Sequence, residues 1–115
     1  MFFAYLLIAL VLAMALVASA SAKLAMVDQV IAPITSIGVP PTSLRYLAAL
    51  EILGAIGLII GLVVPAIGIA AAVGIIAYFV GAVVAHLRAG DSNIAAPAFL
   101  AFMAVGALLL RSYSL

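Results

Sequence analysis

Long apolar runs separated by short polar segments make up most of this chain. A transmembrane helix needs about 20 predominantly apolar residues. The pattern predicts four membrane-spanning helices, over about residues 2–32, 41–62, 66–88 and 94–111. We expect an all-α membrane protein, with a four-transmembrane-helix bundle in a single domain that covers residues 1–115.

The first run has two interpretations. Its small-residue end, residues 18–22, is typical of a secretory signal peptide. However, it lacks a positively charged start and is longer than the usual apolar segment of about 7 to 15 residues. We favour an uncleaved first helix, which continues because apolar residues recur at helical spacing as far as Ile31. Pro33 is expected to end it.

The composition fits a lipid-embedded protein and excludes several function classes. Only 6% of the 115 residues are charged, against about 25% in soluble domains. The net charge of +1 gives no reason to expect nucleic acid as a partner. Without cysteine, the chain has no disulfides or thiolate sites. One histidine and three acidic residues are too few for the usual zinc sites, so we predict no metal.

Glu51 places an acidic side chain inside the second apolar run. A charged side chain at the bilayer centre costs about 2.5–3.5 kcal/mol on insertion scales, so it normally faces the bundle interior and has a partner. Gly54, Gly57 and Gly61 recur on the same helical face. Such a glycine face allows close approach of a neighbouring helix. We therefore expect Glu51 to point into the bundle.

The third predicted helix carries a second set of small residues. Gly74 and Gly81 form a stripe with Tyr78, and His86 adjoins it near the helix end. We interpret both glycines as helix-packing positions. Tyr78, or alternatively Tyr46, is expected to form a wall of any polar pocket.

Alternating spans place most charges on one membrane face. Lys23, Arg45 and Arg88 lie on that face, whereas Arg111 lies on the other. The positive-inside rule then makes it cytoplasmic and puts both termini outside. Glu51 can reach this face together with Lys23, His86 and Arg88, which predicts a one-sided polar cluster.

Several short motifs, in this order and spacing, resemble the DoxX-like family of small four-helix integral membrane proteins. The resemblance is clearest from Lys23 to Asp91, and it rests on Lys23, Gly38-Val39-Pro40, residues 50–58, Pro65 with Gly68, and residues 85–91. It implies a four-span bundle with a polar cluster at Lys23, Glu51, His86, Arg88 and Asp91.

What is known of the family suggests several functions. Its name comes from a subunit associated with a quinol oxidase and thiosulfate oxidation, and relatives are linked to bacterial oxidative-stress complexes and to receptor assembly in animals. The resemblance thus implies an accessory subunit of a membrane redox complex, in the bacterial inner membrane. The lack of cysteine argues against direct sulfur chemistry by this chain.

Our leading hypothesis is a binding protein in the lipid bilayer, whose polar pocket takes the head group of a quinone or lipid. No cofactor is expected to be bound covalently. A quinone carbonyl would accept from Lys23 or His86, and Glu51 would relay a proton. A membrane protein partner or a second copy of the chain is also compatible with the pattern.

Three other interpretations stay open. In the plainest, Glu51 forms a structural ion pair with Lys23 or Arg88. The protein could be a membrane enzyme that uses Glu51 and His86 as acid and base. It could also be an assembly chaperone whose glycine faces receive the helices of other membrane proteins.

Overall fold

The computed structural model describes residues 1–115 and contains helices without strands. The elements are α1 (Phe2–Leu24), α2 (Asp28–Thr35), the short 3-10 helix η1 (Pro41–Ser43), α3 (Leu44–Ile60), α4 (Pro65–Arg88) and α5 (Ala95–Tyr113). Helices α1, α3 (together with η1), α4 and α5 are long and apolar enough to cross a membrane. The predicted all-α bundle of four spans is confirmed.

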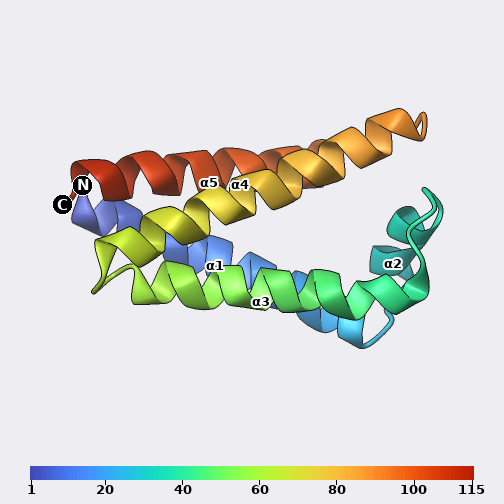
Figure 1. The fold of residues 1–115 in the computed structure, drawn as a ribbon, viewed down its shortest axis with the longest axis horizontal. Helices are drawn as coiled ribbons and strands as arrows, with labels where there is room; N and C mark the ends of the chain where they lie inside the picture. Colours follow the sequence, from blue (N-terminus) through green and yellow to red (C-terminus); the bar gives the residue numbers. More distant parts are fainter.

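The four spans run alternately along the long axis of the molecule, which measures 42 Å. Figure 1 shows both termini and the α3–α4 turn at one end, with α2 and the α4–α5 turn at the other. We call these the terminal end and the α2 end. The length is enough to cross a hydrocarbon core of about 30 Å.

The first span is shorter than predicted. Helix α1 ends at Leu24, and Met26 has a φ of 57°, a left-handed conformation that cannot continue a right-handed helix. The chain therefore turns, and residues 28–35 form the separate helix α2. Pro33 lies inside α2 instead of ending a longer helix, and α2 stops two residues later at Thr35.

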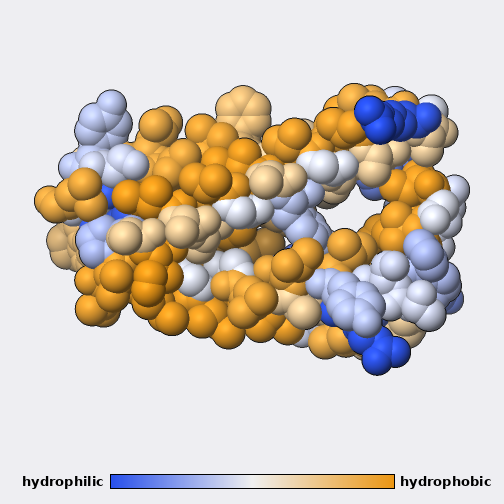
Figure 2. All heavy atoms as spheres, in the orientation of Figure 1, coloured by the Kyte–Doolittle hydropathy of each residue, from blue (hydrophilic) through white to orange (hydrophobic).

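The outer surface of the bundle is apolar along most of its length. Figure 2 shows hydrophobic residues covering the middle, with hydrophilic ones gathered towards the two ends. Large side chains such as Phe3, Leu53 and Phe102 are mostly exposed, Phe102 to 80%. Such a surface is suited to contact with lipid, so the packed core is thin and lies along the bundle axis.

The glycines of α3 allow close contact with α4. A Cβ atom on Gly57 would lie 2.6 Å from the Cβ of Ala71, and one on Gly54 would lie 2.9 Å from Ile75 Cγ1. Gly61 meets the backbone of Gly68. The α3–α4 hairpin is therefore closely packed from its turn towards the middle of the bundle.

Gly74 and Gly81 do not have the packing role predicted for them. A Cβ atom on either residue would meet nothing within 4 Å. Both are exposed, Gly74 near the middle of α4 and Gly81 closer to the α2 end, so neither is on the part of α4 that contacts α3.

Arg111 closes the terminal end. It is only 4% exposed, although it is a charged residue in the last turn of α5. Its Nε donates to the carbonyl of Gly61 at 2.7 Å, and its guanidinium lies 5.5 Å from the ring centroid of Tyr5. The Tyr5 hydroxyl donates to the carbonyl of Leu58 at 2.8 Å. Because the last carbonyls of a helix lack intrahelical partners, these two side chains satisfy the end of α3.

We expect Gly57→Ala to destabilise the bundle by about 1–3 kcal/mol, because the new methyl group would overlap Ala71 in a closely packed contact. Thermal unfolding in detergent measures the effect. Gly74→Ala is the matched control, since its methyl group meets open space and alanine favours helix by about 0.5–1 kcal/mol. Equal loss of stability in both variants would contradict the α3–α4 contact described here.

Candidate functional site

A buried ion pair connects α1 to α3. Lys23 lies in the last turn of α1, and Glu51 lies near the middle of α3. Lys23 Nζ is 2.6 Å from Glu51 Oε1, and it also donates to Ser19 Oγ at 2.7 Å. The two charged side chains are 6% and 0% exposed. Each charge therefore compensates the other inside an apolar bundle, as burial requires.

The ion pair leaves one donor and one acceptor unused. A lysine ammonium has three N–H donors, and Lys23 spends two of them on Glu51 and Ser19. Glu51 Oε2 is the only buried side-chain nitrogen or oxygen atom that has no hydrogen-bond partner. The pair is thus electrically balanced but retains hydrogen-bonding capacity on both partners.

A second polar pair lies at the end of α4. His86 Nδ1 and Asp91 Oδ2 are 2.9 Å apart, and His86 is 8% exposed. Asp91 Oδ1 accepts from the backbone N–H of Asn93 at 2.9 Å. This backbone hydrogen bond, followed by the contact with His86, lowers the pKa of Asp91 below its ordinary value. The carboxylate therefore stays ionised and holds the imidazole by Nδ1, which leaves Nε2 for another partner.

Lys23 and His86 line one cavity at the α2 end. Its volume is about 570 Å³, and it lies between the α1–α3 pair and the α4–α5 pair. Figure 2 shows the bundle hollowed between these pairs near that end. We call it the end cavity. Its other lining residues include Ser19, Val30, Ile34, Ile37, Leu47, Tyr78, Phe79, Gly81, Ala85 and Leu100.

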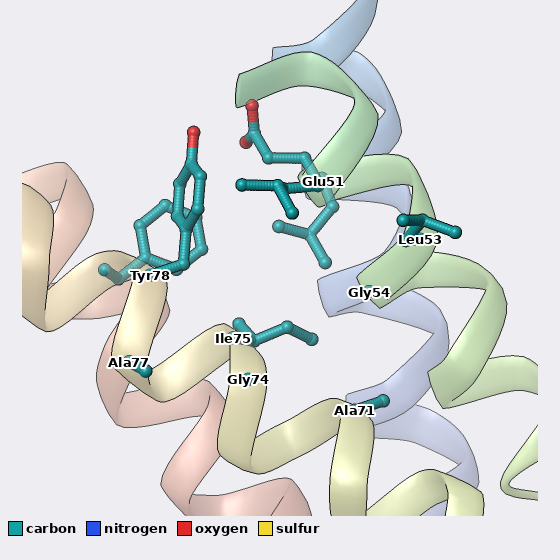
Figure 3. Close-up of a pocket in the computed structure, with 11 residues that line it drawn as sticks. Glu51, Leu53, Gly54, Ala71, Gly74, Ile75, Ala77 and Tyr78 are labelled. Atoms are coloured by element: carbon teal, nitrogen blue, oxygen red, sulfur yellow. The ribbon is translucent and has the colours of Figure 1, made fainter. Parts of the chain in front are cut away.

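Glu51 borders a different cavity, between α3 and α4. Its volume is about 510 Å³, and Leu16 of α1 contributes to its wall. We call it the side groove; Figure 3 shows Glu51, Leu53, Gly54, Ala71, Gly74, Ile75, Ala77 and Tyr78 around it. Leu53, Gly74 and Ala77 are exposed on the outside of the bundle, so the groove opens towards lipid. Tyr78 and Phe79 line both cavities and form the wall they share.

The predicted polar cluster is thus divided into two pairs. Lys23 and Glu51 lie together, His86 pairs with Asp91, and Lys23 shares the end cavity with His86. Arg88 is exposed and joins neither ion pair, because it lies on the outer side of α4. Glu51 borders the side groove whereas His86 borders the end cavity, so the two do not face a common substrate there.

Of the two tyrosines predicted to form a wall of the polar pocket, Tyr78 lines the end cavity, whereas Tyr46 is 68% exposed and does not. Ser19 was not predicted as part of the site, although its spacing of four residues from Lys23 puts both on one face of α1. Asn93, whose backbone N–H donates to Asp91, was not predicted either. No group of three or more His, Cys, Asp or Glu residues is arranged to hold a metal ion.

Four apolar spans, two of which are joined by a buried ion pair inside the bundle, define a small multi-pass integral membrane protein. Residues 7–108 match the DoxX-like family, and the chain belongs to that family. The match includes most of the first and last spans, beyond the motifs between Lys23 and Asp91. No curated protein and no solved structure matches the chain.

We expect Lys23→Met to lower the free energy of unfolding by about 3–5 kcal/mol, because it leaves the Glu51 carboxylate buried without its partner. Adding Glu51→Leu should restore most of this loss, since both charges are then removed. Denaturant unfolding in micelles, arranged as a double-mutant cycle, measures the coupling. If Lys23→Met alone were as stable as the double variant with Glu51→Leu, the pairing would be contradicted.

Proposed function

We propose that the end cavity binds the polar head group of a quinone- or lipid-like molecule. The observation that carries the proposal is the presence of two hydrogen-bonding groups, the Lys23 ammonium and Nε2 of His86, in one largely apolar cavity. They come from α1 and α4, which places them in different helix pairs. The Lys23 ammonium suits an acceptor group such as a quinone carbonyl or a lipid phosphate, and His86 Nε2 adds a second hydrogen bond to the head group, as a donor in the imidazolium and as an acceptor in the neutral ring.

The walls of the end cavity suit the apolar part of such a ligand. Val30 and Ile34 of α2, Leu47 of α3 and Leu100 of α5 supply aliphatic surface. The volume of about 570 Å³ falls within the range of about 300–1,000 Å³ that is common for small-molecule sites. A few polar groups in an apolar cavity are the usual arrangement, because the polar groups orient the ligand while its apolar part supplies affinity.

The residues around the cavity then have distinct roles. Glu51 balances the charge of Lys23, and Ser19 fixes the direction of its Nζ. Asp91 orients the His86 ring. In an accessory subunit of a membrane redox complex, the same cavity would hold the molecule that the complex oxidises or reduces. The partner would then contact the apolar outer surface.

The other two functions have less geometric support. Acid–base catalysis by Glu51 and His86 requires a shared substrate position, yet they border separate cavities. An assembly chaperone would need free glycine faces; Gly57 and Gly61 are packed against α4, which leaves Gly74 and Gly81 as the free glycines of these two helices.

We expect a benzoquinone with a decyl side chain, or an anionic phospholipid, to bind the purified protein. His86→Leu should weaken binding about tenfold, through loss of one hydrogen bond at Nε2. Gly81→Leu should also weaken it, because its side chain enters the end cavity without a backbone clash. Equilibrium binding in nanodiscs measures both effects.

Arg88→Gln is the control for charge, because Arg88 is exposed close to the cavity but does not line it. Its affinity should equal that of the unsubstituted protein. Absence of binding by both probes, or full affinity in His86→Leu, would overturn the proposal.

For localisation, we propose the bacterial inner membrane with the α2 end in the cytoplasm. Lys23 and Arg111 are buried, so neither counts as a loop charge. Arg45 and Arg88 remain exposed, and both lie towards the α2 end. The positive-inside rule therefore favours that end as cytoplasmic, with both termini outside.

The absence of cysteine makes this orientation straightforward to test. Ser92→Cys lies at the α2 end and Ser112→Cys at the terminal end, both at exposed positions. A membrane-impermeant maleimide applied to spheroplasts should label Ser112→Cys directly but Ser92→Cys only after permeabilisation. The reverse pattern would show the opposite orientation.

A further inference from the structure

The unpaired oxygen of Glu51 lies outside the function proposed above. Oε1 accepts from Lys23, whereas Oε2 is fully buried and accepts from nothing. A buried carboxylate oxygen without a hydrogen bond is energetically unfavourable, and such atoms are rare in native proteins. Glu51 lines the side groove, so a molecule that enters there can supply the missing donor.

The side groove is accessible from the lipid. Leu50 and Leu53 on its α3 side are 55% and 64% exposed. On the α4 side, Gly74 leaves open space where a side chain would stand. Figure 3 shows the Glu51 carboxylate at one end of the groove, with the Tyr78 ring across from it. The Tyr78 hydroxyl lies near the Glu51 carboxylate but makes no hydrogen bond of normal geometry with it, so Oε2 has no partner in this arrangement.

We propose that the side groove binds the hydroxyl group of a membrane-soluble molecule, which donates its hydrogen bond to Glu51 Oε2. An ionised carboxylate only accepts, so the ligand group must be a donor. Lys23 already balances its charge, and a second cation or an anion would leave a net charge in a poorly solvated site. An uncharged hydroxyl satisfies the oxygen without that penalty.

The apolar lining holds the rest of the molecule. Leu16, Leu50, Ile75 and Phe79 contribute aliphatic and aromatic surface along the groove. The hydroxyl of a long-chain alcohol and that of an alkyl hydroquinone share this chemistry. The side groove then selects a hydrogen-bond donor, because it presents Glu51 as an acceptor. The end cavity selects an acceptor, because it presents Lys23 as a donor.

Photolabelling of the full chain in nanodiscs tests the site. The probe is a diazirine-bearing hexadecanol, and its methyl ether is the matched control because it has the same chain without the O–H donor. We expect the alcohol to label residues 50–54 and 74–78 about tenfold more than the ether does, which is the effect of one hydrogen bond to a charged acceptor. If excess dodecyl hydroquinone reduces the labelling, the site also takes hydroquinones. If only unlabelled hexadecanol reduces it, the site is restricted to lipid alcohols.

Two α4 variants locate the labelling. Gly74→Leu should abolish the difference between alcohol and ether, since its side chain occupies the side groove. Gly81→Leu fills the end cavity, so it should leave alcohol labelling unchanged while it weakens quinone binding. Ala77→Leu, at an exposed position on the groove rim, supplies a second block if Gly74→Leu does not fold.

Equal labelling by alcohol and ether in the unsubstituted protein would overturn the hydroxyl site. Retention of the preference in both folded groove variants would also overturn it. Either result leaves the end cavity unaffected, because that proposal depends on quinone or phospholipid binding and on His86. The two proposals can therefore fail separately.

Discussion

Lys23 and Glu51 bring opposite charges together inside a bundle that offers little other polar surface. Neither charge could be buried alone, since an unpaired ion in a low-dielectric interior carries a penalty of several kcal/mol. The 2.6 Å contact therefore fixes the rotation of α1 relative to α3. It also determines what the cavities contain, because Lys23 faces the end cavity while Glu51 faces the side groove.

The two ends of the molecule are built differently. At the terminal end, Gly61 and Gly68 bring α3 and α4 into backbone contact, and Arg111 closes the end of α3. Farther from that end, open space borders Gly74 near the middle of α4 and Gly81 towards the α2 end. A closed end holds the helices together while the other end retains cavities, so stability and binding are located in different parts of one small bundle.

The spans were predictable because each needs only a long apolar run. The need for a partner of Glu51 was predictable too, because Glu51 lies inside one of these runs. Which of Lys23, His86 and Arg88 is that partner was not predictable, because it depends on how α1 and α4 are rotated. The end of α1 was missed because apolar spacing continues into α2, and backbone conformation at Met26 leaves no trace in that pattern. Gly74 and Gly81 resemble the packed glycines of α3, but which side of α4 meets another helix is a tertiary property.

The ion pair also bears on how the chain enters the membrane. Glu51, near the middle of α3, disfavours insertion of that helix by about 2.5–3.5 kcal/mol on the insertion scale, and Lys23 adds a smaller cost in the last turn of α1. Lys23 and Glu51 belong to the first two spans of the chain, separated only by α2 and a short connection. Their pairing becomes available once α3 has emerged from the ribosome, so α1 and α3 are suited to leave the translocon as one hairpin. The contact that organises the finished bundle would thus also order its biogenesis.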